Sequence, residues 1–273
     1  MTTSTFDVAV VGDNTIDRYL DEPDLGDLIG GNALNVAAQL AMLGLRVGYF
    51  GAVGTDADAA VVRRAAKVRG IDISGLVTLS GRTALTTIRR DADGDRRFES
   101  EDFGVTAQYH PDDDALRRIA DARWIHVGML PKSQSFGEAV AQLSDVPMSQ
   151  DCSVSPDSHR LAVQFASAGE DEVEAERIVS AAVAGPSELA VATLGARGAL
   201  AGRAERRWRV PSEPVAVVDT TGAGDSFMAG FIAARLRGDD VEEALHSGIR
   251  RGSFTCRYMG GWPQLPADVR QFG

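Results

Sequence analysis

Short apolar runs alternate with longer segments of helical periodicity along most of the chain. The runs typical of buried strands fall at residues 8–11, 47–53, 124–127, 189–193 and 215–218. Helical spacing of apolar residues predicts helices over residues 32–43, 56–69, 133–143, 170–183 and 223–235. Strands separated by helices of ten or more residues indicate βαβ units. We therefore expect an α/β fold, a doubly wound and mostly parallel sheet flanked by helices, in a single domain over residues 1–273.

One segment departs from this alternation. Residues 83–90 and 96–100 read as two strands, joined by Asp91-Ala92-Asp93-Gly94-Asp95. An Asp-Gly pair in such a spacer is a hairpin signal. The pattern leaves two possibilities open, because the hairpin is either an edge of the main sheet or a small second element that covers it.

A glycine-rich segment opens the predicted helix at 223–235. It reads Asp219-Thr220-Thr221-Gly222-Ala223-Gly224-Asp225 and follows the strand predicted at 215–218. Small residues let the backbone approach a ligand, and the exposed N–H groups of a first helical turn attract anions. Asp225 in that turn either complements the helix dipole, worth about 0.3–1 kcal/mol, or acts as a general base.

A second glycine pair precedes the helix at 32–43. Asn32 and Asn35 lie three residues apart in its first turn and could both face a polyhydroxyl ligand, although an N-cap is the simpler interpretation of Asn32. Upstream, Asp13 and Asp17 follow the first strand at its carboxyl end, where ligands bind in open α/β sheets. Both are candidates for holding sugar hydroxyls, and ordinary loop and cap chemistry is the alternative.

Composition narrows the classes of function. The 273 residues carry 28 Lys and Arg against 39 Asp and Glu, a net charge of −11, which argues against nucleic acid as a partner. The apolar runs are too short to span a membrane, the first residues lack a signal-peptide pattern, and two cysteines cannot form a disulfide framework. We expect a cytoplasmic protein that binds neither nucleic acid nor membrane.

Three segments together resemble a known family. GGNALNVAAQLAMLGLRVGYFGAVGTDADA is similar to the first signature of the ribokinase-like (PfkB) carbohydrate kinases, DTTGAGDSFMAGFIAARL is similar to the second, and TLGARGAL resembles the segment between them. The resemblance runs from about residue 6 to residue 266. Within the family, GDN near the start, GGNALNVA and the short chain most resemble the fructoselysine 6-kinase subgroup.

The resemblance implies roles for individual residues. Asp225 corresponds to the catalytic base, and the backbone anion hole corresponds to Gly222, Ala223 and Gly224. The sugar-binding positions correspond to Asp17, Gly30, Gly31 and Asn35, flanked by Asp13 and Asn14. The loop that lines the nucleotide corresponds to Thr193, Gly195 and Gly198, with Arg197 where many members carry Lys.

The resemblance also implies cofactors, and here the chain departs from the family pattern. The Asn-x-x-Glu segment associated with magnesium and phosphate reads Ser167-Ala168-Gly169-Glu170, so the Asn is replaced and Glu170 is kept. Asp219 and Thr221 occupy the positions of a monovalent cation site, which implies K⁺, with part of 253–261 completing it. The hairpin at 83–100 resembles the family's lid, which also forms a dimer contact in several members, although the short stretch between residues 20 and 30 suggests a reduced lid.

The expected function is therefore transfer of the γ-phosphoryl group of ATP, with Mg²⁺, to a hydroxyl of a sugar or a fructoselysine-like sugar–amine conjugate. Acidic residues such as Asp102 or Asp13 are candidates for meeting the ammonium group of such a conjugate. One alternative is another acceptor, such as ribose, fructose, a phosphorylated hexose or a nucleoside. A catalytically weak sugar or nucleotide sensor is a second. A dinucleotide-dependent oxidoreductase is disfavoured, because no G-x-G-x-x-G follows the first strand.

Overall fold

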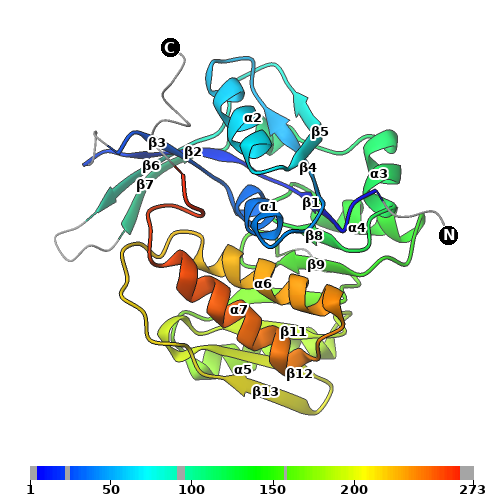
Figure 1. Cartoon of the computed structure of the whole chain (residues 1–273). Coiled ribbons are helices and arrows are strands. Elements are labelled where there is room, and N and C mark those ends of the chain that lie inside the picture. Colours follow the sequence, from blue (N-terminus) through cyan, green and yellow to red (C-terminus); the bar gives the residue numbers. More distant parts are fainter. Residues whose placement is uncertain (1–4, 22–24, 91–95, 157–158, 265–273) are drawn as a thin grey trace.

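The chain forms two β-sheets with helices packed around the larger one (Figure 1). The computed structural model describes residues 5–21, 25–90, 96–156 and 159–264. Within these ranges the larger sheet has nine strands in the order β13-β12-β11-β10-β9-β8-β1-β4-β5. The bounds are β1 (Val8–Val11), β4 (Val47–Val53), β5 (Asp72–Thr78), β8 (Ile125–Val127), β9 (Met148–Asp151), β10 (Val163–Ser167), β11 (Ala190–Thr193), β12 (Ala199–Arg203) and β13 (Arg206–Val210). Its strands pair parallel except near one edge, where β12 is antiparallel to both β11 and β13.

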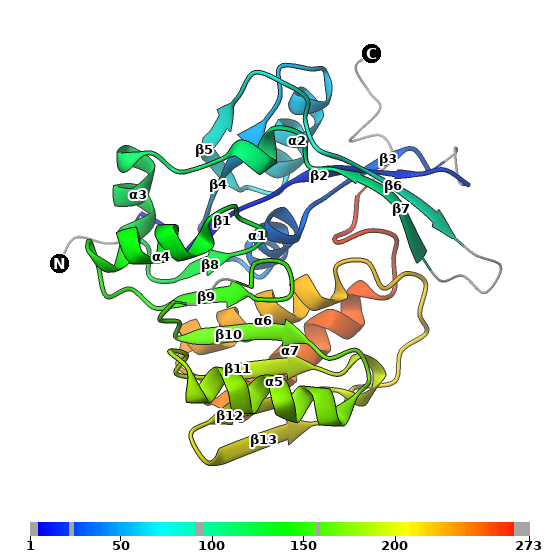
Figure 2. The ribbon, with the colours of Figure 1, turned by 180° about the vertical axis from the view of Figure 1, so that it is seen from behind.

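Helices cover both faces of this sheet, as Figures 1 and 2 show. One face packs against α1 (Asn32–Met42), α2 (Asp58–Val68), α6 (Ala223–Arg237) and α7 (Val241–Thr255). The other packs against α3 (Asp113–Ala120), α4 (Ser133–Ala141) and α5 (Glu172–Ala184). The expected doubly wound α/β fold is confirmed. The long helix α6 buries its apolar side chains against this sheet. Among them, the rings of Phe227 and Phe231 make edge-to-face contacts with the ring of Phe165 on β10.

The prediction of a strand at residues 215–218 is wrong. No regular element occurs among the described residues between the end of β13 at Val210 and the start of α6 at Ala223. Val217 and Val218 are 59% and 46% exposed. An apolar run becomes an interior strand only where neighbouring strands and helices bury it, and this segment instead crosses the surface from the edge of the sheet to α6.

The smaller sheet, which we call the lid sheet, has the order β3-β2-β6-β7. Its strands are β2 (Thr15–Tyr19), β3 (Asp27–Gly30), β6 (Leu85–Arg90) and β7 (Arg96–Asp102). β6 and β7 pair antiparallel as the hairpin pattern predicts, while β2 pairs parallel to β6. The hairpin thus belongs to a second sheet and not to the main one. The predicted turn at 91–95 lies outside the described residues.

The order of the main sheet reverses at β1. This strand pairs with β4 on one side and with β8 on the other, so the chain leaves its carboxyl end at a switch point between two directions of winding. Ligands bind at such points because the loops that follow adjacent strands diverge there. Gly12, Asp13 and Asn14 follow β1 directly.

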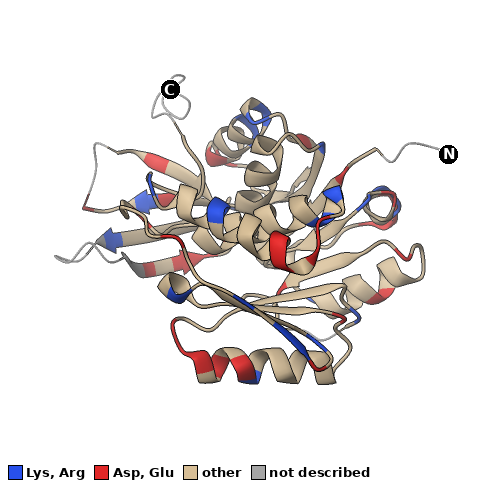
Figure 3. Ribbon diagram, turned by 60° about the horizontal axis from the view of Figure 1, so that its bottom comes forward, with Lys and Arg blue, Asp and Glu red and all other residues tan. Residues whose placement is uncertain are grey.

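Figure 3 shows acidic and basic residues on helices, on strands and in the segments between them. Around α5, Glu172 pairs with Arg197 at 3.5 Å and also contacts Arg209, while Glu176 pairs with Arg207 at 2.9 Å. Exposed pairs of this kind contribute about 0–1 kcal/mol each, so they hold the edge of the sheet only weakly. No helix in the described part of the chain is both long enough and apolar enough to cross a membrane.

Candidate active site

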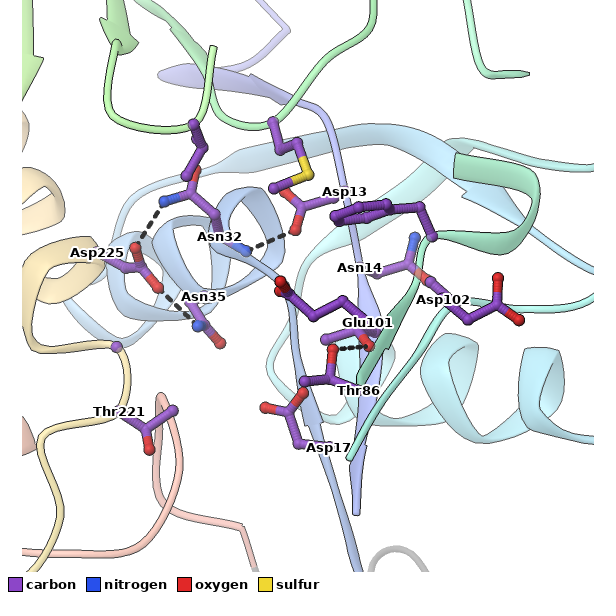
Figure 4. A pocket seen from close by; sticks show the side chains of 17 residues that line it. Asp13, Asn14, Asp17, Asn32, Asn35, Thr86, Glu101, Asp102, Thr221 and Asp225 are labelled. Atoms are coloured by element: carbon purple, nitrogen blue, oxygen red, sulfur yellow. Dashed lines mark hydrogen bonds between the residues drawn. The ribbon is translucent and has the colours of Figure 1, made fainter. Parts of the chain in front are cut away.

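A pocket of about 290 Å³ lies where the carboxyl end of β1, the N-termini of α1 and α6 and the lid sheet meet (Figure 4). Segments that are far apart in the sequence line it, and the described lining residues are Asp13, Asn14, Thr15, Asp17, Gly31, Asn32, Asn35, Ala84, Thr86, Glu101, Asp102, Phe103, Met129, Val154, Thr221, Gly222 and Asp225. The residues expected to bind sugar, apart from Gly30, therefore share one cavity with the expected base.

Asp225 projects from the first turn of α6 toward the first turn of α1. Its Oδ1 accepts a hydrogen bond from Asn32 Nδ2 at 2.8 Å, and its Oδ2 accepts one from Asn35 Nδ2 at 2.6 Å. The two asparagines lie three residues apart on one helix, so the spacing that predicted a shared face is correct. The N-cap interpretation of Asn32 is wrong, because α1 begins at Asn32 and its N-cap, Gly31, makes no side-chain cap bond.

Burial dominates the electrostatics of Asp225. The desolvation of its carboxylate raises its pKa from 3.8 to about 8, and the negative charges of Asp151 and Asp13 raise it further. The amide donors of Asn35 and Asn32 act in the opposite direction, because they stabilise the ionised form. The side chain therefore changes its protonation near neutral pH, which is the range in which a general base works.

The loop before Asp225 has the conformation that an anion site needs. Gly222 has φ +68°, and a Cβ there would lie 2.6 Å from the Cα of Gly261, so only glycine fits. Among the described residues, the N–H groups of Gly224 and Asp225 have no recorded backbone acceptor, and the space beside Gly224 is open. These N–H groups at the positive end of a 15-residue helix can bind a phosphoryl group.

Asp13 and Asn14 are buried where the chain leaves β1. Both carboxylate oxygens of Asp13 accept backbone N–H groups of α1, from Asn32 at 2.8 Å and Ala33 at 2.9 Å. Asn14 Nδ2 donates to the carbonyl oxygen of Ala52 at 2.8 Å and to the hydroxyl of Tyr49 at 3.1 Å. These bonds fix the amide of Asn14, and its buried Oδ1 has no hydrogen-bond partner in the structure.

The lid sheet contributes the opposite wall of the pocket. Asp17 is 5% exposed and lies against Gly30, while the hydroxyl of Thr86 is 3.0 Å from that of Thr15. β7 adds Glu101 and Asp102 at the wall formed by the hairpin. The sequence pattern indicated Asp102 only as one candidate for an ammonium group and did not indicate Glu101, because β7 reaches the pocket through the pairing of β6 with the distant strand β2.

The residues expected at the nucleotide lie outside the lining of this pocket. Ser167 and Thr193 are register partners on β10 and β11, and Glu170 packs beside Gly195 in the turn that follows. Gly198 has φ +99°, and a Cβ there would lie 2.0 Å from the carbonyl oxygen of Val210. The guanidinium group of Arg197 is exposed and paired with Glu172.

Asp219 and Thr221, expected at a monovalent cation, form a buried cluster before α6. Asp219 accepts hydrogen bonds from the N–H of Thr221 at 2.9 Å and of Gly260 at 2.8 Å, and from the Tyr19 hydroxyl at 3.2 Å. The cluster therefore joins the lid sheet, the anion loop and the segment around residue 260. In the described part of the chain, no group of three or more His, Cys, Asp or Glu side chains could hold a metal ion.

Asp151 was not identified from the sequence. It ends β9, is 7% exposed, and its Oδ2 accepts from Asn32 Nδ2 at 2.8 Å. Its carboxylate is thus connected to Asp225 through a single amide group. The position of Asp151 could have indicated it, because β9 is parallel to β8 and ends at the same edge of the sheet as β1. The sequence did not predict a strand at β9, because its residues are mostly polar.

Comparison with known proteins agrees with this geometry. Residues 6–268 match the pfkB family of carbohydrate kinases, and the chain belongs to that family. It is 31% identical over 267 residues to the fructoselysine 6-kinase of Escherichia coli K12, which covers 93% of this chain and 99% of that one. It is 27% identical to a fructosamine kinase of Bacillus subtilis, over 92% of this chain and 91% of that one.

Solved structures show the same fold. The Arabidopsis thaliana ribokinase complexed with ribose and ATP superposes with a TM-score of 0.79 at 22% identity, over 97% of this chain and 98% of that one. The protein is accordingly an ATP-dependent sugar kinase.

Proposed function

We propose that this kinase phosphorylates a hydroxyl of a sugar–amine conjugate of the fructoselysine kind, with Asp225 as the general base. The observation that carries the proposal is the position of Asp225, which lies in the pocket at the N-terminus of α6 and is held there by Asn32 and Asn35. The similarity to fructoselysine and fructosamine kinases supports the choice of acceptor.

In the proposed reaction, the acceptor hydroxyl donates its proton to Asp225 as its oxygen forms a bond to the γ-phosphorus of ATP. The bond from that phosphorus to the bridging oxygen breaks in line, and ADP leaves with the electron pair. Negative charge on the transferring group is stabilised by the N–H groups of Gly224 and Asp225 and by the dipole of α6. Because the raised pKa of Asp225 is about 8, the residue is a stronger base than an ordinary carboxylate.

ATP is proposed to bind along the loop from Thr193 to Gly198 as its Mg²⁺ complex. Magnesium needs only one or two carboxylates besides the phosphates and water, and the exposed Glu170 beside Gly195 fits that requirement. K⁺ is proposed near Asp219 and Thr221, where it would add positive potential beside the anion loop. We place the protein in the cytoplasm, where ATP is supplied.

The test is an ADP-release assay with fructoselysine, fructose, ribose, fructose 6-phosphate and adenosine, in the presence of Mg²⁺ and with K⁺ or Na⁺. We expect preferred turnover of fructoselysine and a rate at least 100-fold lower for Asp225→Asn, because general-base assistance is worth about 10²–10⁴-fold. Isothermal titration should show that Asp225→Asn still binds sugar. Asp114→Asn on the exposed surface of α3 is the matched control. Retention of more than about a tenth of the wild-type kcat by Asp225→Asn contradicts the assignment of the base.

A homodimer through the lid sheet is also proposed. Two ion pairs lie on the described part of this sheet and beside it, Arg18 with Asp27 at 2.7 Å and Arg89 with Asp21 at 2.9 Å. A contact made by such a surface would be polar and weakened by salt. Light scattering at low and high ionic strength tests this, and a monomer under both conditions excludes it.

A further inference from the structure

The pocket is rich in carboxyl groups. Five carboxyl side chains reach it, Asp13, Asp17, Glu101, Asp102 and Asp225, and none of the described lining residues is Lys, Arg or His. Mutual repulsion acts inside this group, since Asp13 raises the pKa of Asp225. A ligand with a positive charge would offset this repulsion.

The amide of Asn14 indicates a ligand that carries hydrogen-bond donors, whether amine or hydroxyl. Asn14 is fully buried, and both hydrogens of its amide nitrogen are used within the protein, toward Ala52 and Tyr49. Its Oδ1 is buried without a hydrogen-bond partner among the described residues, and Asn14 is one of the residues that line the pocket. A buried acceptor of this kind requires a donor, and leaving it unpaired costs about 1–3 kcal/mol. An N–H or O–H group of a ligand bound in this pocket would supply that donor.

The carboxylates are not equivalent in position. Figure 4 shows the Glu101 side chain extending from β7 into the pocket, with Asp102 at the side of the pocket opposite Asp225. Both oxygens of Asp13 are occupied by N–H groups of α1, and Asp225 is held by two asparagines. Asp102 accepts one hydrogen bond, from the N–H of Gly104 at 3.0 Å. No cation within the described residues pairs with Glu101.

We propose that Glu101, with Asp102 at the rim, forms a receptor for the ammonium group of the acceptor and thereby selects amine-bearing sugars over neutral ones. The inference rests on the proposed function, since it assumes that the acceptor lies in this pocket with its reacting hydroxyl at Asp225. The ammonium group then lies at the far end of the ligand, against the lid sheet. Phe103 follows directly and offers its ring to an aliphatic substituent on the amine.

Two sugar substrates that differ only in the substituent on one carbon test the recognition of the ammonium group directly. 1-Amino-1-deoxyfructose carries an ammonium group where fructose carries a hydroxyl, so the ratio of their kcat/KM values measures recognition of the charge. We expect Glu101→Gln to lower kcat/KM at least tenfold for the amino sugar and less than threefold for fructose. Asp102→Asn should lower the ratio by a smaller factor. A general disturbance of the lid would instead lower both values equally.

Glu99→Gln is the matched control, because Glu99 lies on the same strand, pairs with Arg89 and does not line the pocket. This variant removes the same charge and should leave the ratio unchanged.

Titration calorimetry with both sugars supplies a second measurement, in which Glu101→Gln should weaken binding of the amino sugar at least tenfold. An unchanged ratio and unchanged binding in Glu101→Gln overturn the inference. If wild-type enzyme turns over other sugars but neither binds nor phosphorylates the amino sugar, the amine receptor is also excluded while the kinase stands. If the wild-type enzyme turns over none of the sugars, the proposed function itself is contradicted.

Discussion

Asn32 donates from its side-chain nitrogen to Asp225 at 2.8 Å, across the boundary between the first turns of α1 and α6. The same nitrogen donates to Asp151 at 2.8 Å. One amide therefore holds two carboxylates, one of which is the proposed base. Because like charges close together raise each other's pKa, this arrangement couples the protonation of Asp225 to the charge of Asp151.

The first prediction concerns the pH dependence of turnover. A base must be ionised to accept a proton, and burial raises the pKa of Asp225 to about 8. We expect kcat/KM for the sugar to rise about tenfold per pH unit below pH 8 and to level off above it. Steady-state kinetics between pH 6 and pH 9.5 measure this, with fixed excess Mg²⁺. A flat profile over this range would show that another group controls the rate.

The second prediction tests the coupling through Asn32. Asp151→Asn removes one negative charge and keeps an oxygen that can accept from Asn32, so the pKa of Asp225 should fall. The midpoint of the kcat/KM profile should move to lower pH by about one unit, equivalent to roughly 1.4 kcal/mol. Asp114→Asn, on the exposed first turn of α3, should leave the midpoint in place. An unmoved midpoint in Asp151→Asn would mean that the two carboxylates do not interact.

The third prediction concerns stability. The pKa of Asp225 is higher in the folded chain, about 8, than its ordinary value of 3.8, so the folded state binds the proton more tightly. Its contribution to stability is fully present below about pH 4 and is lost as the pH rises through 8. Asp225→Asn has no titrating group at this position and does not lose this stability. The free energy of unfolding of the variant minus that of wild type should therefore be larger at pH 9 than at pH 5, by an amount on the order of 3 kcal/mol. Urea unfolding at both pH values measures the difference, and the same difference at both pH values would contradict the raised pKa.

Local patterns predicted the parts of this site that follow from helix and strand geometry. The helical spacing of Asn32 and Asn35 placed both amides in one turn, and the glycine-rich segment before Asp225 predicted a helix N-terminus with exposed N–H groups. The position of Asp13 after β1 predicted its place at the carboxyl edge of the sheet. Each of these features depends on residues close together in the sequence.

The remaining features depend on burial by distant segments. β9 contains Ser149 and Gln150, which are fully buried although polar, because Trp124 donates to the hydroxyl of Ser149 and the side chain of Gln150 donates to the carbonyl oxygen of Ser155. No apolar run marks such a strand, so Asp151 at its end was missed. The apolar run at 215–218 shows the converse, since Val217 and Val218 remain 59% and 46% exposed. The parallel pairing of β2 with β6, which brings Glu101 to the pocket, also joins distant segments.

The fourth prediction concerns Gly31, the residue that precedes α1. Its φ is +101°, and a Cβ would lie 2.4 Å from the Cα of Asn14, whose backbone cannot move without shifting the end of β1. Gly31→Ala should lower the free energy of unfolding by about 3 kcal/mol or more and raise the KM for sugar. Gly44→Ala is the control, because Gly44 has φ +85° with nothing within 4 Å, and only the strain of the backbone, about 1–2 kcal/mol, is expected. Equal losses in the two variants would show that the contact with Asn14 is unimportant.

The fifth prediction separates substrate binding from chemistry at Asp17. This carboxylate is buried in the wall of the lid sheet, across the pocket from Asp225, and is proposed to hold hydroxyl groups that do not react. Such contacts form equally in the ground state and the transition state, so Asp17→Ala should raise the KM for sugar at least tenfold and change kcat by less than threefold. Asp27→Ala on neighbouring β3 removes a partly exposed carboxylate that pairs with Arg18, and it should change neither value. If Asp17→Ala instead lowers kcat with KM unchanged, Asp17 acts on the transferring group. The proposal that the lid sheet binds the sugar while α6 supplies the catalytic groups is then wrong.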